Sequence, residues 1–321
     1  MTSTDICIPL ADSRQIYRVE DVSRAQEESA PSRNEALASF YERMKALGGT
    51  RFVVKPSRSD SVDSLFERCP NFDEVIEDVK KSLALAVSGN EPVSFAPILL
   101  LGEPGIGKTH FARALADRLG TGFHFVSMSS LTAGWILSGA SAQWNHSKPG
   151  KVAQALVGGE MANPLIVLDE VDKAGGDARY DPMGALYELF EHDTARRFRD
   201  EYVDVDIDAS HILWVTTAND ERNIPEPILN RMNVYSIPRP DAGESYAIAS
   251  RLYRDIVGEH DWGFPDEPPP DVIERLAGMP PREQRRALLA AFGNAKLAGR
   301  DSVEVEDVDS FRAGRKRKIG F

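Results

Sequence analysis

Apolar residues recur along this chain at two spacings, which predict different elements. In residues 34–47, and again in residues 72–87, they return every three or four positions. That interval places them on one face of a helix. Glycines follow both stretches, at positions 48, 49 and 89, and glycine commonly ends helices. We therefore predict two amphipathic helices, of which the first is a docking helix.

Three other stretches, residues 97–101, 165–168 and 212–215, are short and continuously apolar. They are too short for helices and suit strands of a parallel sheet that is covered on both faces. Sequence with helical spacing precedes the second and the third stretch. Strands that alternate with helices indicate βαβ units, so the pattern predicts an α/β fold with a parallel sheet.

The strand pattern stops after residues 238–240, and residues 244–256, 271–276 and 281–297 have the spacing of helices. The first 33 residues are polar and aperiodic, so we expect them to be mobile or to order only against another element. The predicted organisation is an N-terminal polar segment with the docking helix (1–60), an α/β domain (61–240), a small all-α domain (241–312) and a basic tail (313–321).

Composition and charge narrow the class of protein. The chain has 321 residues, of which 42% are hydrophobic, and its net charge is −12. This charge argues against a protein that binds nucleic acid mainly through the phosphates. Two cysteines cannot build a disulfide framework, and the six histidines show no metal-ligand spacing. No apolar run reaches the roughly 18 residues of a membrane span, and residues 1–20 lack the order of a signal peptide. We expect a cytoplasmic protein that does not contact membranes.

One motif points to a specific chemistry. Residues 102–109 match the phosphate-loop pattern G-x-x-x-x-G-K-[ST] at every fixed position. The motif follows a predicted strand and leads into an amphipathic helix at 111–119. Its glycines allow backbone N–H groups to turn toward a polyphosphate, and the helix N-terminus adds partial positive charge. Lys108 would contact the β- and γ-phosphates, and Thr109 would ligate Mg²⁺. The predicted nucleotide-binding residues are Gly102, Glu103, Pro104, Gly105, Ile106, Gly107, Lys108, Thr109 and His110.

Polar residues end two of the predicted strands. Asp169 and Glu170 close the strand at 165–168, at the end where ligands bind in open α/β sheets. Asp169 would orient the Mg²⁺ shell and Glu170 would polarise the attacking water, although acids in this position also occur in helix-cap turns. Asn219 follows the strand at 212–215, where its amide would hold the water or the γ-phosphate. An asparagine that only bonds its own turn is the alternative.

These residues resemble the AAA+ superfamily of ATPases and, within it, the ATPase module of the Lon proteases. The similarity covers residues 66–299. It is carried, in order, by residues 102–116, 147–156, 163–173, 181–191, 214–220 and 224–237. The resemblance implies a three-layer P-loop α/β domain followed by a helical lid, with ATP and Mg²⁺ as cofactors. It also implies a homo-oligomeric ring, usually of six subunits, with ATP at the subunit boundaries.

The family resemblance also implies roles for individual residues. Asn219 corresponds to the first sensor, and Arg231 to the arginine finger that reaches the γ-phosphate of the neighbouring subunit. A guanidinium suits this task because it is always charged and forks onto phosphate oxygens. Arg282 corresponds to the second sensor, although Arg285 and Arg286 remain alternatives. Rings of this kind commonly grip a polypeptide with a pore-loop aromatic, and Trp144 stands in that place. A packing role for Trp144 is the alternative, because the next two residues depart from the usual triplet.

The chain also departs from Lon. Only residues 313–321 follow the predicted lid, so we expect no protease domain of its own, and about 60 residues stand in place of the N-terminal substrate domain. The basic residues 315–318 and the terminal tripeptide 319–321 are either a solvated tail or a contact for a separate partner. The preferred hypothesis is ATP-driven remodelling of a protein client. The alternatives are a nucleic-acid-directed loader or motor and a nucleotide-gated scaffold.

Overall fold

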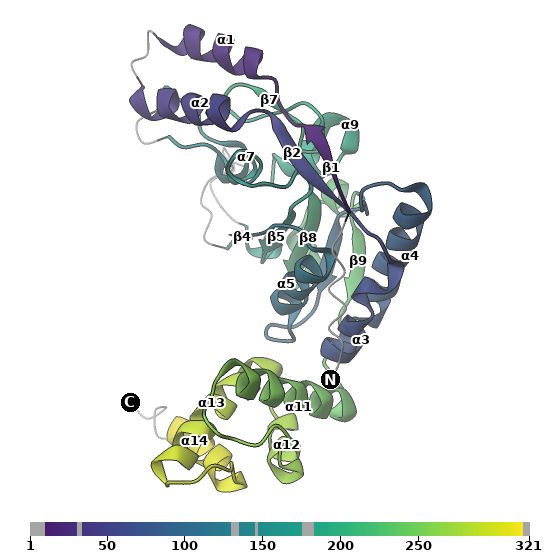
Figure 1. Cartoon of the computed structure of the whole chain (residues 1–321), viewed down its shortest axis with the longest axis vertical. Coiled ribbons are helices and arrows are strands. Elements are labelled where there is room, and N and C mark those ends of the chain that lie inside the picture. Colours follow the sequence, from purple (N-terminus) through teal and green to yellow (C-terminus); the bar gives the residue numbers. More distant parts are fainter. Residues whose placement is uncertain (1–9, 31–33, 130–134, 145–146, 175–182, 317–321) are drawn as a thin grey trace. The chain divides into compact units, whose positions relative to one another are not determined.

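A computed structural model describes residues 10–30, 34–129, 135–144, 147–174 and 183–316 (Figure 1). The chain divides into two compact units. The first comprises residues 1–62, 74–101 and 112–236, and the second comprises residues 63–73, 102–111 and 237–321. The phosphate-loop motif is therefore grouped with the C-terminal helices.

A five-stranded parallel sheet forms the centre of the first unit. Its order is β4 (Phe123–Ser127), β5 (Leu165–Asp169), β8 (Leu213–Ala218), β3 (Ile98–Leu101) and β9 (Asn233–Ser236). The three central strands are the three that the apolar runs predict. The sequence did not reveal β4 and β9, because they are edge strands with only one buried residue each and therefore lack a continuous apolar run.

Helices α4 (Asp73–Gly89), α5 (Lys108–Leu119) and α7 (Lys151–Gly158) accompany the sheet (Figure 1). Leu99 of β3, Ile166 of β5 and Leu156 of α7 belong to one buried cluster, so α7 and the sheet share a core. Shorter elements of this unit are α6 (Trp135–Ser138), α8 (Leu186–Leu189), α9 (His192–Ala195), α10 (Glu226–Leu229) and the hairpin of β6 (Phe198–Arg199) with β7 (Asp206–Ile207). Short 3-10 helices span Ser59–Val62, Val171–Lys173 and Glu221–Asn223.

The N-terminal segment contains elements that the sequence did not predict. Strand β1 (Leu10–Gln15) pairs antiparallel with β2 (Thr50–Lys55), and helix α1 (Val19–Ser29) is followed by α2 (Glu35–Leu47). Val22 is the buried residue of α1, so its apolar signal is too weak to read from the sequence. The segment orders against other parts of the same chain, because Ile16, Val22 and Tyr41 join the core cluster that includes the sheet.

The second unit contains α3 (Ser64–Arg68), a 3-10 turn (Pro70–Phe72), the phosphate loop and four helices. These are α11 (Ala242–Glu259), α12 (Pro270–Ala277), α13 (Pro281–Leu297) and α14 (Val305–Lys316). Tyr253, Leu276 and Phe292 belong to their shared core. The predicted α/β fold with a helical lid is therefore confirmed. Among the described helices, none has the length and apolar character needed to cross a membrane.

Candidate nucleotide-binding and hydrolysis site

The phosphate loop connects β3 to α5, which begins at Lys108. Gly105 and Gly107 have φ angles of +86° and +107°, in the region that favours glycine. A Cβ atom on Gly102 would lie 2.7 Å from the carbonyl oxygen of Ile237. The motif glycines are thus required by the backbone path itself. The loop delivers the N-terminus of a 12-residue helix, an arrangement that favours anions.

Lys108 lies over the loop that precedes it. Its Nζ donates hydrogen bonds to the carbonyl oxygens of Gly102 and, at 3.1 Å, of Glu103. The side chain is buried, so the ammonium group is held close to the loop backbone. This position suits an ammonium group that contacts phosphate bound in the same loop.

Three segments of the second unit converge on the phosphate loop. The ring of Phe72 stacks on that of Phe111, with centroids 4.5 Å apart. Arg239 pairs with the carboxylate of Glu103. The Cβ of Arg282, in the first turn of α13, lies 3.6 Å from the position that a Cβ on Gly105 would occupy. Sequence reasoning missed Phe72 and Arg239, because no local pattern marks them as neighbours of the loop.

The position of Arg282 bears on the choice between three arginines. Arg285 lies instead near Glu259, with Nη2 and Oε2 3.5 Å apart. The position of Arg282 beside Gly105 therefore favours it over Arg285. Its role as second sensor stays a prediction.

In the first unit, Thr217 bonds both Asp169, the last residue of β5, and Glu170, which follows the strand. Its hydroxyl donates to Asp169 Oδ1 at 2.8 Å and accepts a bond from the backbone N–H of Glu170 at 3.0 Å. Thr217 comes from the neighbouring strand β8 and is buried. Glu170 has a φ angle of +57°, unusual for a residue with a side chain. The structure therefore holds the turn after β5 in a defined conformation.

Charged side chains extend this network. Glu170 forms an ion pair with Lys173, and this hydrogen bond raises the pKa of the lysine. Asp172, which is buried, accepts hydrogen bonds from the backbone N–H groups of Asn219 at 3.1 Å and Asp220 at 3.2 Å. Asp172 thus ties the turn that carries Glu170 to the turn that carries Asn219. Hydrogen bonds from Arg222 lower the pKa of Asp220 to about 2.

The sheet register explains why these residues belong together. Leu168 of β5 pairs with Thr216 of β8, and Leu101 of β3 pairs with Ala218 of β8. The strands are parallel, so their C-terminal ends lie at one edge of the sheet, where ligands bind in open α/β folds. Asn219 follows directly after β8, and the chain enters the phosphate loop directly after Leu101.

The residues described above fit ATP and a divalent cation. A glycine loop at a helix N-terminus with a lysine suits a polyphosphate. The hydroxyl of Thr109 and the carboxylate of Asp169 are oxygen ligands of the kind that Mg²⁺ prefers. Their assignment to the metal, like the other catalytic assignments, stays a prediction.

Arg231, directly after α10 and Asn230, is engaged within its own chain. Its Nε lies 2.8 Å from Glu191 Oε1, and Nη1 donates to the carbonyl oxygen of Pro227 at 2.5 Å. The guanidinium group also lies 5.9 Å from the centre of the Tyr187 ring. The finger role of Arg231 stays a prediction.

Trp144 is half-exposed and meets a second tryptophan. Its ring contacts that of Trp135 edge-on, with centroids 5.5 Å apart. The two side chains are 50% and 36% exposed, so neither is a core residue. Sequence reasoning missed Trp135, which the residue pattern does not connect to Trp144. His146 and residues 317–321, the last part of the predicted basic tail, lie outside the described residues, whereas residues 313–316 belong to helix α14.

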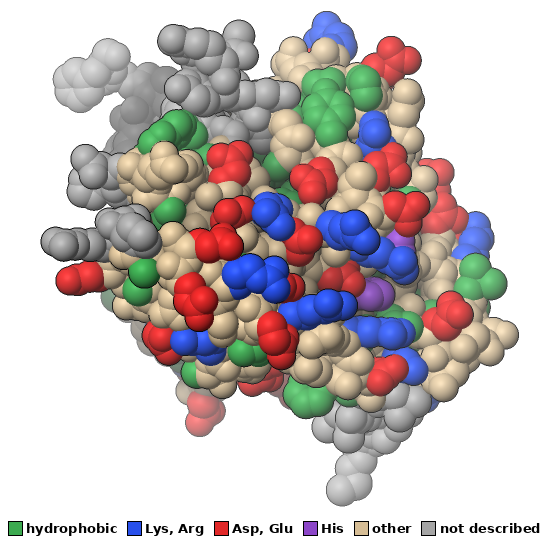
Figure 2. Space-filling model, turned by 90° about the horizontal axis from the view of Figure 1, so that it is seen from above, with side chains coloured by type: hydrophobic (Ala, Val, Ile, Leu, Met, Phe, Trp, Pro, Cys, Tyr) green, Lys and Arg blue, Asp and Glu red, His purple; other side chains and the backbone are tan. Residues whose placement is uncertain are grey.

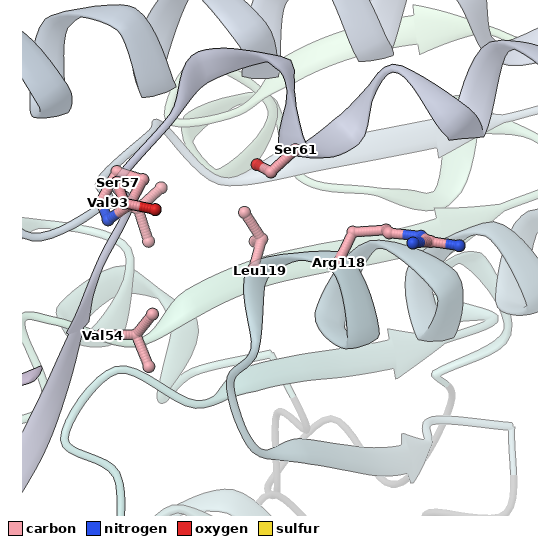
Figure 3. A pocket seen from close by; sticks show the side chains of 7 residues that line it. Val54, Ser57, Ser61, Val93, Arg118 and Leu119 are labelled. Carbon is pink, nitrogen blue, oxygen red and sulfur yellow. The ribbon is translucent and has the colours of Figure 1, made fainter. Parts of the chain in front are cut away.

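A small pocket of the first unit is separate from the phosphate loop. It is lined by Val54, Pro56, Ser57, Ser61, Val93, Arg118 and Leu119. Figure 3 shows Leu119 pointing into it and Arg118 extending away. Arg118 and Leu119 end helix α5, whereas the phosphate loop meets its first residue, about 16 Å away along the helix axis. This pocket does not belong to the candidate site.

Comparison with known proteins finds one family model and several relatives that match parts of this chain. Residues 98–238 match the family described as "ATPase family associated with various cellular activities (AAA)". The Lon protease of Halothermothrix orenii is 38% identical over 189 residues, which are 58% of this chain and 24% of that protein. The Lon protease of Azorhizobium caulinodans is 33% identical over 245 residues, 73% of this chain and 28% of that protein. The chain spans about a quarter of the length of these relatives.

A solved structure agrees at the level of the fold. A closed-state reconstruction of Hsp104 with ATPγS and FITC casein matches with a TM-score of 0.58 and 17% sequence identity. The match covers 74% of this chain and 48% of that one. The match of residues 98–238 and the Lon relatives confirm the expected resemblance to an AAA-type ATPase module of the Lon kind.

Proposed function

Because this chain carries an ATPase module of the AAA family that is similar to the one in Lon proteases, we propose that it hydrolyses ATP with Mg²⁺ and uses the energy to remodel a protein client in a homo-oligomeric ring. The observation that supports this most is the meeting of Asp169, Glu170 and Asn219 at the ends of adjacent strands, beside the strand that leads into the phosphate loop. A cytoplasmic location suits the proposal, because ATP is supplied there.

In the proposed mechanism, the phosphate loop binds the nucleotide mainly through backbone N–H groups, and Lys108 contacts the β- and γ-phosphates. Thr109 and Asp169 would hold the metal, and bound Mg²⁺ would neutralise charge that develops on the phosphate oxygens. Arg282 would contact the nucleotide from the lid. The hydrogen bonds of Lys108 to its own loop would then be exchanged for bonds to phosphate.

Glu170 would accept a proton from the attacking water. Its carboxylate is paired with Lys173, so we propose that it leaves this pair when the nucleotide binds. Thr217 and Asp172 would hold the acid and Asn219 in register, since they bond Asp169, the Glu170 backbone and the Asn219 backbone. Preorganised groups of this kind reduce the barrier because they need not reorient during the reaction.

The client would be gripped by Trp144. An exposed indole makes contacts with extended chains that tolerate many sequences, and the edge-on contact with Trp135 enlarges the aromatic surface. We propose that ATP turnover moves this surface, and that Arg231 of one subunit completes the site of its neighbour. Figure 2 shows one face of the molecule on which Lys and Arg side chains lie among Asp and Glu side chains, a distribution that does not favour nucleic acid as the client.

Two substitutions test the chemistry. Lys108→Ala should abolish binding of a fluorescent ATP analogue, whereas Glu170→Gln should bind it normally and lose turnover by at least about 100-fold. A Glu170→Gln variant that hydrolyses ATP at the parental rate would contradict the assignment of the base.

A second experiment tests the client. Unfolded casein should raise the ATPase rate of the parental chain, and Trp144→Ala should remove that increase while leaving the basal rate unchanged. Stimulation by DNA or RNA alone would favour a nucleic-acid-directed motor. If Trp144→Ala processes client normally while Glu170→Gln holds a stable ring with its partner, the chain is a nucleotide-gated scaffold.

A further inference from the structure

The loop that carries Trp144 is closed tightly at its base. We call residues 139–150 the Trp144 loop; residues 145 and 146 lie outside the described part. A Cβ on Gly150 would lie 2.4 Å from the backbone nitrogen of Gly139 and 2.1 Å from the carbonyl oxygen of Leu137. The backbone N–H of Ala140 also donates to the carbonyl oxygen of Lys148 at 3.3 Å. The two ends of the loop therefore lie against each other.

A buried carboxylate sits in this base. Asp200 comes from the β6–β7 hairpin and has no exposed surface. Its Oδ2 accepts the backbone N–H of Gly150 at 2.7 Å, and Oδ1 accepts those of Tyr202 and Val203 at 2.9 and 3.1 Å. One oxygen thus serves the loop and the other serves the hairpin. A second link joins the hairpin to α6, because Glu201 N donates to Ser138 O at 2.7 Å.

Helix α2 reaches both the loop and the hairpin. The side-chain amide of Asn34 donates to the carbonyl oxygen of Ala142 in the loop at 3.2 Å. The hydroxyl of Tyr41 donates to the carbonyl oxygen of Val203 in the hairpin at 2.7 Å, and this bond is buried. Asn34 also caps α2, since its Oδ1 accepts the backbone N–H of Leu37 at 3.1 Å. Helix α2 lies outside residues 98–238, the part that matches the ATPase family.

We infer that Asp200, Asn34 and Tyr41 are positioning residues that brace the Trp144 loop, so that the N-terminal helix α2 takes part in presenting the client contact. Asp200 holds the base of the loop at Gly150, and Asn34 holds it at Ala142. Tyr41 acts indirectly, because it bonds Val203 of the hairpin that carries Asp200. The role as a client contact rests on the proposed function, whereas the bracing itself is a property of the fold.

A loop that pulls on a bound polypeptide has to be rigid. An aromatic side chain transmits force to a bound chain only if its backbone does not yield. Residues 139–144 and 147–150 form no helix or strand, so this part of the loop gains rigidity from bonds at its ends and sides. A carboxylate is well suited to the base, because it accepts several N–H bonds at once and charge-assisted bonds are stronger than neutral ones. Burial excludes competing water from these bonds.

The variants separate the contacts. In Asp200→Asn, the remaining side-chain oxygen can still accept the N–H groups of Tyr202 and Val203. The NH₂ group then faces the N–H of Gly150, so the hydrogen bond to the loop is lost. Asn34→Asp keeps the helix cap, because aspartate is an equally good N-cap, but it loses the donor to Ala142. Tyr41→Phe keeps the ring and removes the bond to Val203. Asn34→Asp has a matched control in Glu35→Gln, which changes charge by the same amount, though with opposite sign, one residue away.

Hydrogen exchange followed by mass spectrometry tests the bracing directly. Peptides that cover 139–150 should exchange about fivefold faster in Asp200→Asn and Asn34→Asp, the effect of losing a bond of ordinary strength. Peptides that cover β5 and β8 should be unchanged, and so should the Glu35→Gln control. Loop exchange at the parental rate in folded Asp200→Asn and Asn34→Asp would overturn the inference. If Asp200→Asn does not fold, Asn34→Asp and Tyr41→Phe decide the question.

The functional readout is the ratio of casein-stimulated to basal ATPase rate. The bracing variants should keep the basal rate within about twofold and lose most of the stimulation, which is the result expected of Trp144→Ala. A variant with faster loop exchange but full stimulation would show that bracing does not serve the client contact. If the parental chain itself is not stimulated by casein or by any unfolded protein, the proposed function fails, while the exchange data still decide on the bracing.

Discussion

Single polar side chains organise the acidic end of β5. Thr217 and Thr216 are adjacent on β8, both are buried, and both donate hydrogen bonds, but to different partners. Thr217 bonds Asp169 and the backbone of Glu170, whereas Thr216 bonds the carbonyl oxygen of Ile98 at 3.0 Å. Comparing substitutions of these two threonines therefore separates an effect on catalysis from an effect on stability.

We expect Thr217→Val to lower the ATPase rate by about 10-fold or more, because Asp169 and the Glu170 turn lose their shared hydroxyl. Both Thr217→Val and Thr216→Val should cost about 1–2 kcal/mol of unfolding free energy, since each leaves a buried group unpaired. Steady-state ATPase assays and urea unfolding measure the two effects. Equal loss of turnover in Thr216→Val would assign the effect to the strand rather than to the hydroxyl.

At the scale of elements, the first turn of the Trp144 loop requires a glycine at position 139. Gly139 has a φ angle of +80°, and a Cβ there would lie 2.3 Å from Asp200 Oδ1. Gly48 also has positive φ, +66°, but a Cβ there would meet no atom within 4 Å. The two glycines share a conformational reason and differ in the available space.

Gly48→Ala should therefore cost about 1 kcal/mol, the strain of positive φ alone. Gly139→Ala should cost at least about 2 kcal/mol more, because the methyl group displaces a buried carboxylate. Urea unfolding of the two variants gives the comparison. Similar losses at both positions would mean that the carboxylate moves aside freely and does not anchor the loop.

At the scale of the whole molecule, titration of Asp200 should make the free energy of unfolding depend on pH. Burial raises the pKa of this carboxyl from 3.8 to about 6. The backbone N–H donors of Gly150, Val203 and Tyr202 lower the pKa, whereas the nearby charge of Glu201 raises it further. Between these two values the folded state binds more protons than the unfolded state. The contribution of Asp200 to stability therefore falls as the pH rises through this window and is constant above it.

The free energy of unfolding of the parental chain minus that of Asp200→Asn should shrink between pH 4 and about 6, and then level off. Urea unfolding at several pH values measures this difference. A difference that does not vary with pH would mean that the carboxyl titrates alike in both states. Glu201→Gln is the control, since it removes only the nearby charge.

The proposed ring makes a prediction at the same scale. Arg231→Ala and Lys108→Ala should each be inactive alone, because each lacks one half of every site. In an equal, random mixture, roughly a quarter of the boundaries would combine an intact phosphate loop with an intact Arg231. ATPase activity should return to a comparable fraction. No recovery in mixtures that assemble normally would contradict a site shared between subunits.

The sequence alone predicts the nucleotide chemistry, and it fixes the central architecture that the structure confirms. The phosphate loop, the acids after β5 and the three inner strands are all readable, because each rests on residues that are neighbours in the chain and on one local period. The helical lid was readable for the same reason. Family resemblance added the expected roles of Arg231, Arg282 and Trp144, which local patterns do not supply.

The residues that support these groups from distant parts of the chain are apparent from the folded structure alone. Thr217 lies 48 positions from Asp169, and Asn34 lies 108 positions from Ala142. No period in the sequence encodes such pairs, because they arise when strands align in register and a loop folds against a helix. The edge strands β4 and β9 and the N-terminal β1 were missed for a related reason: their pairing with neighbours stabilises them more than their own weak apolar pattern does.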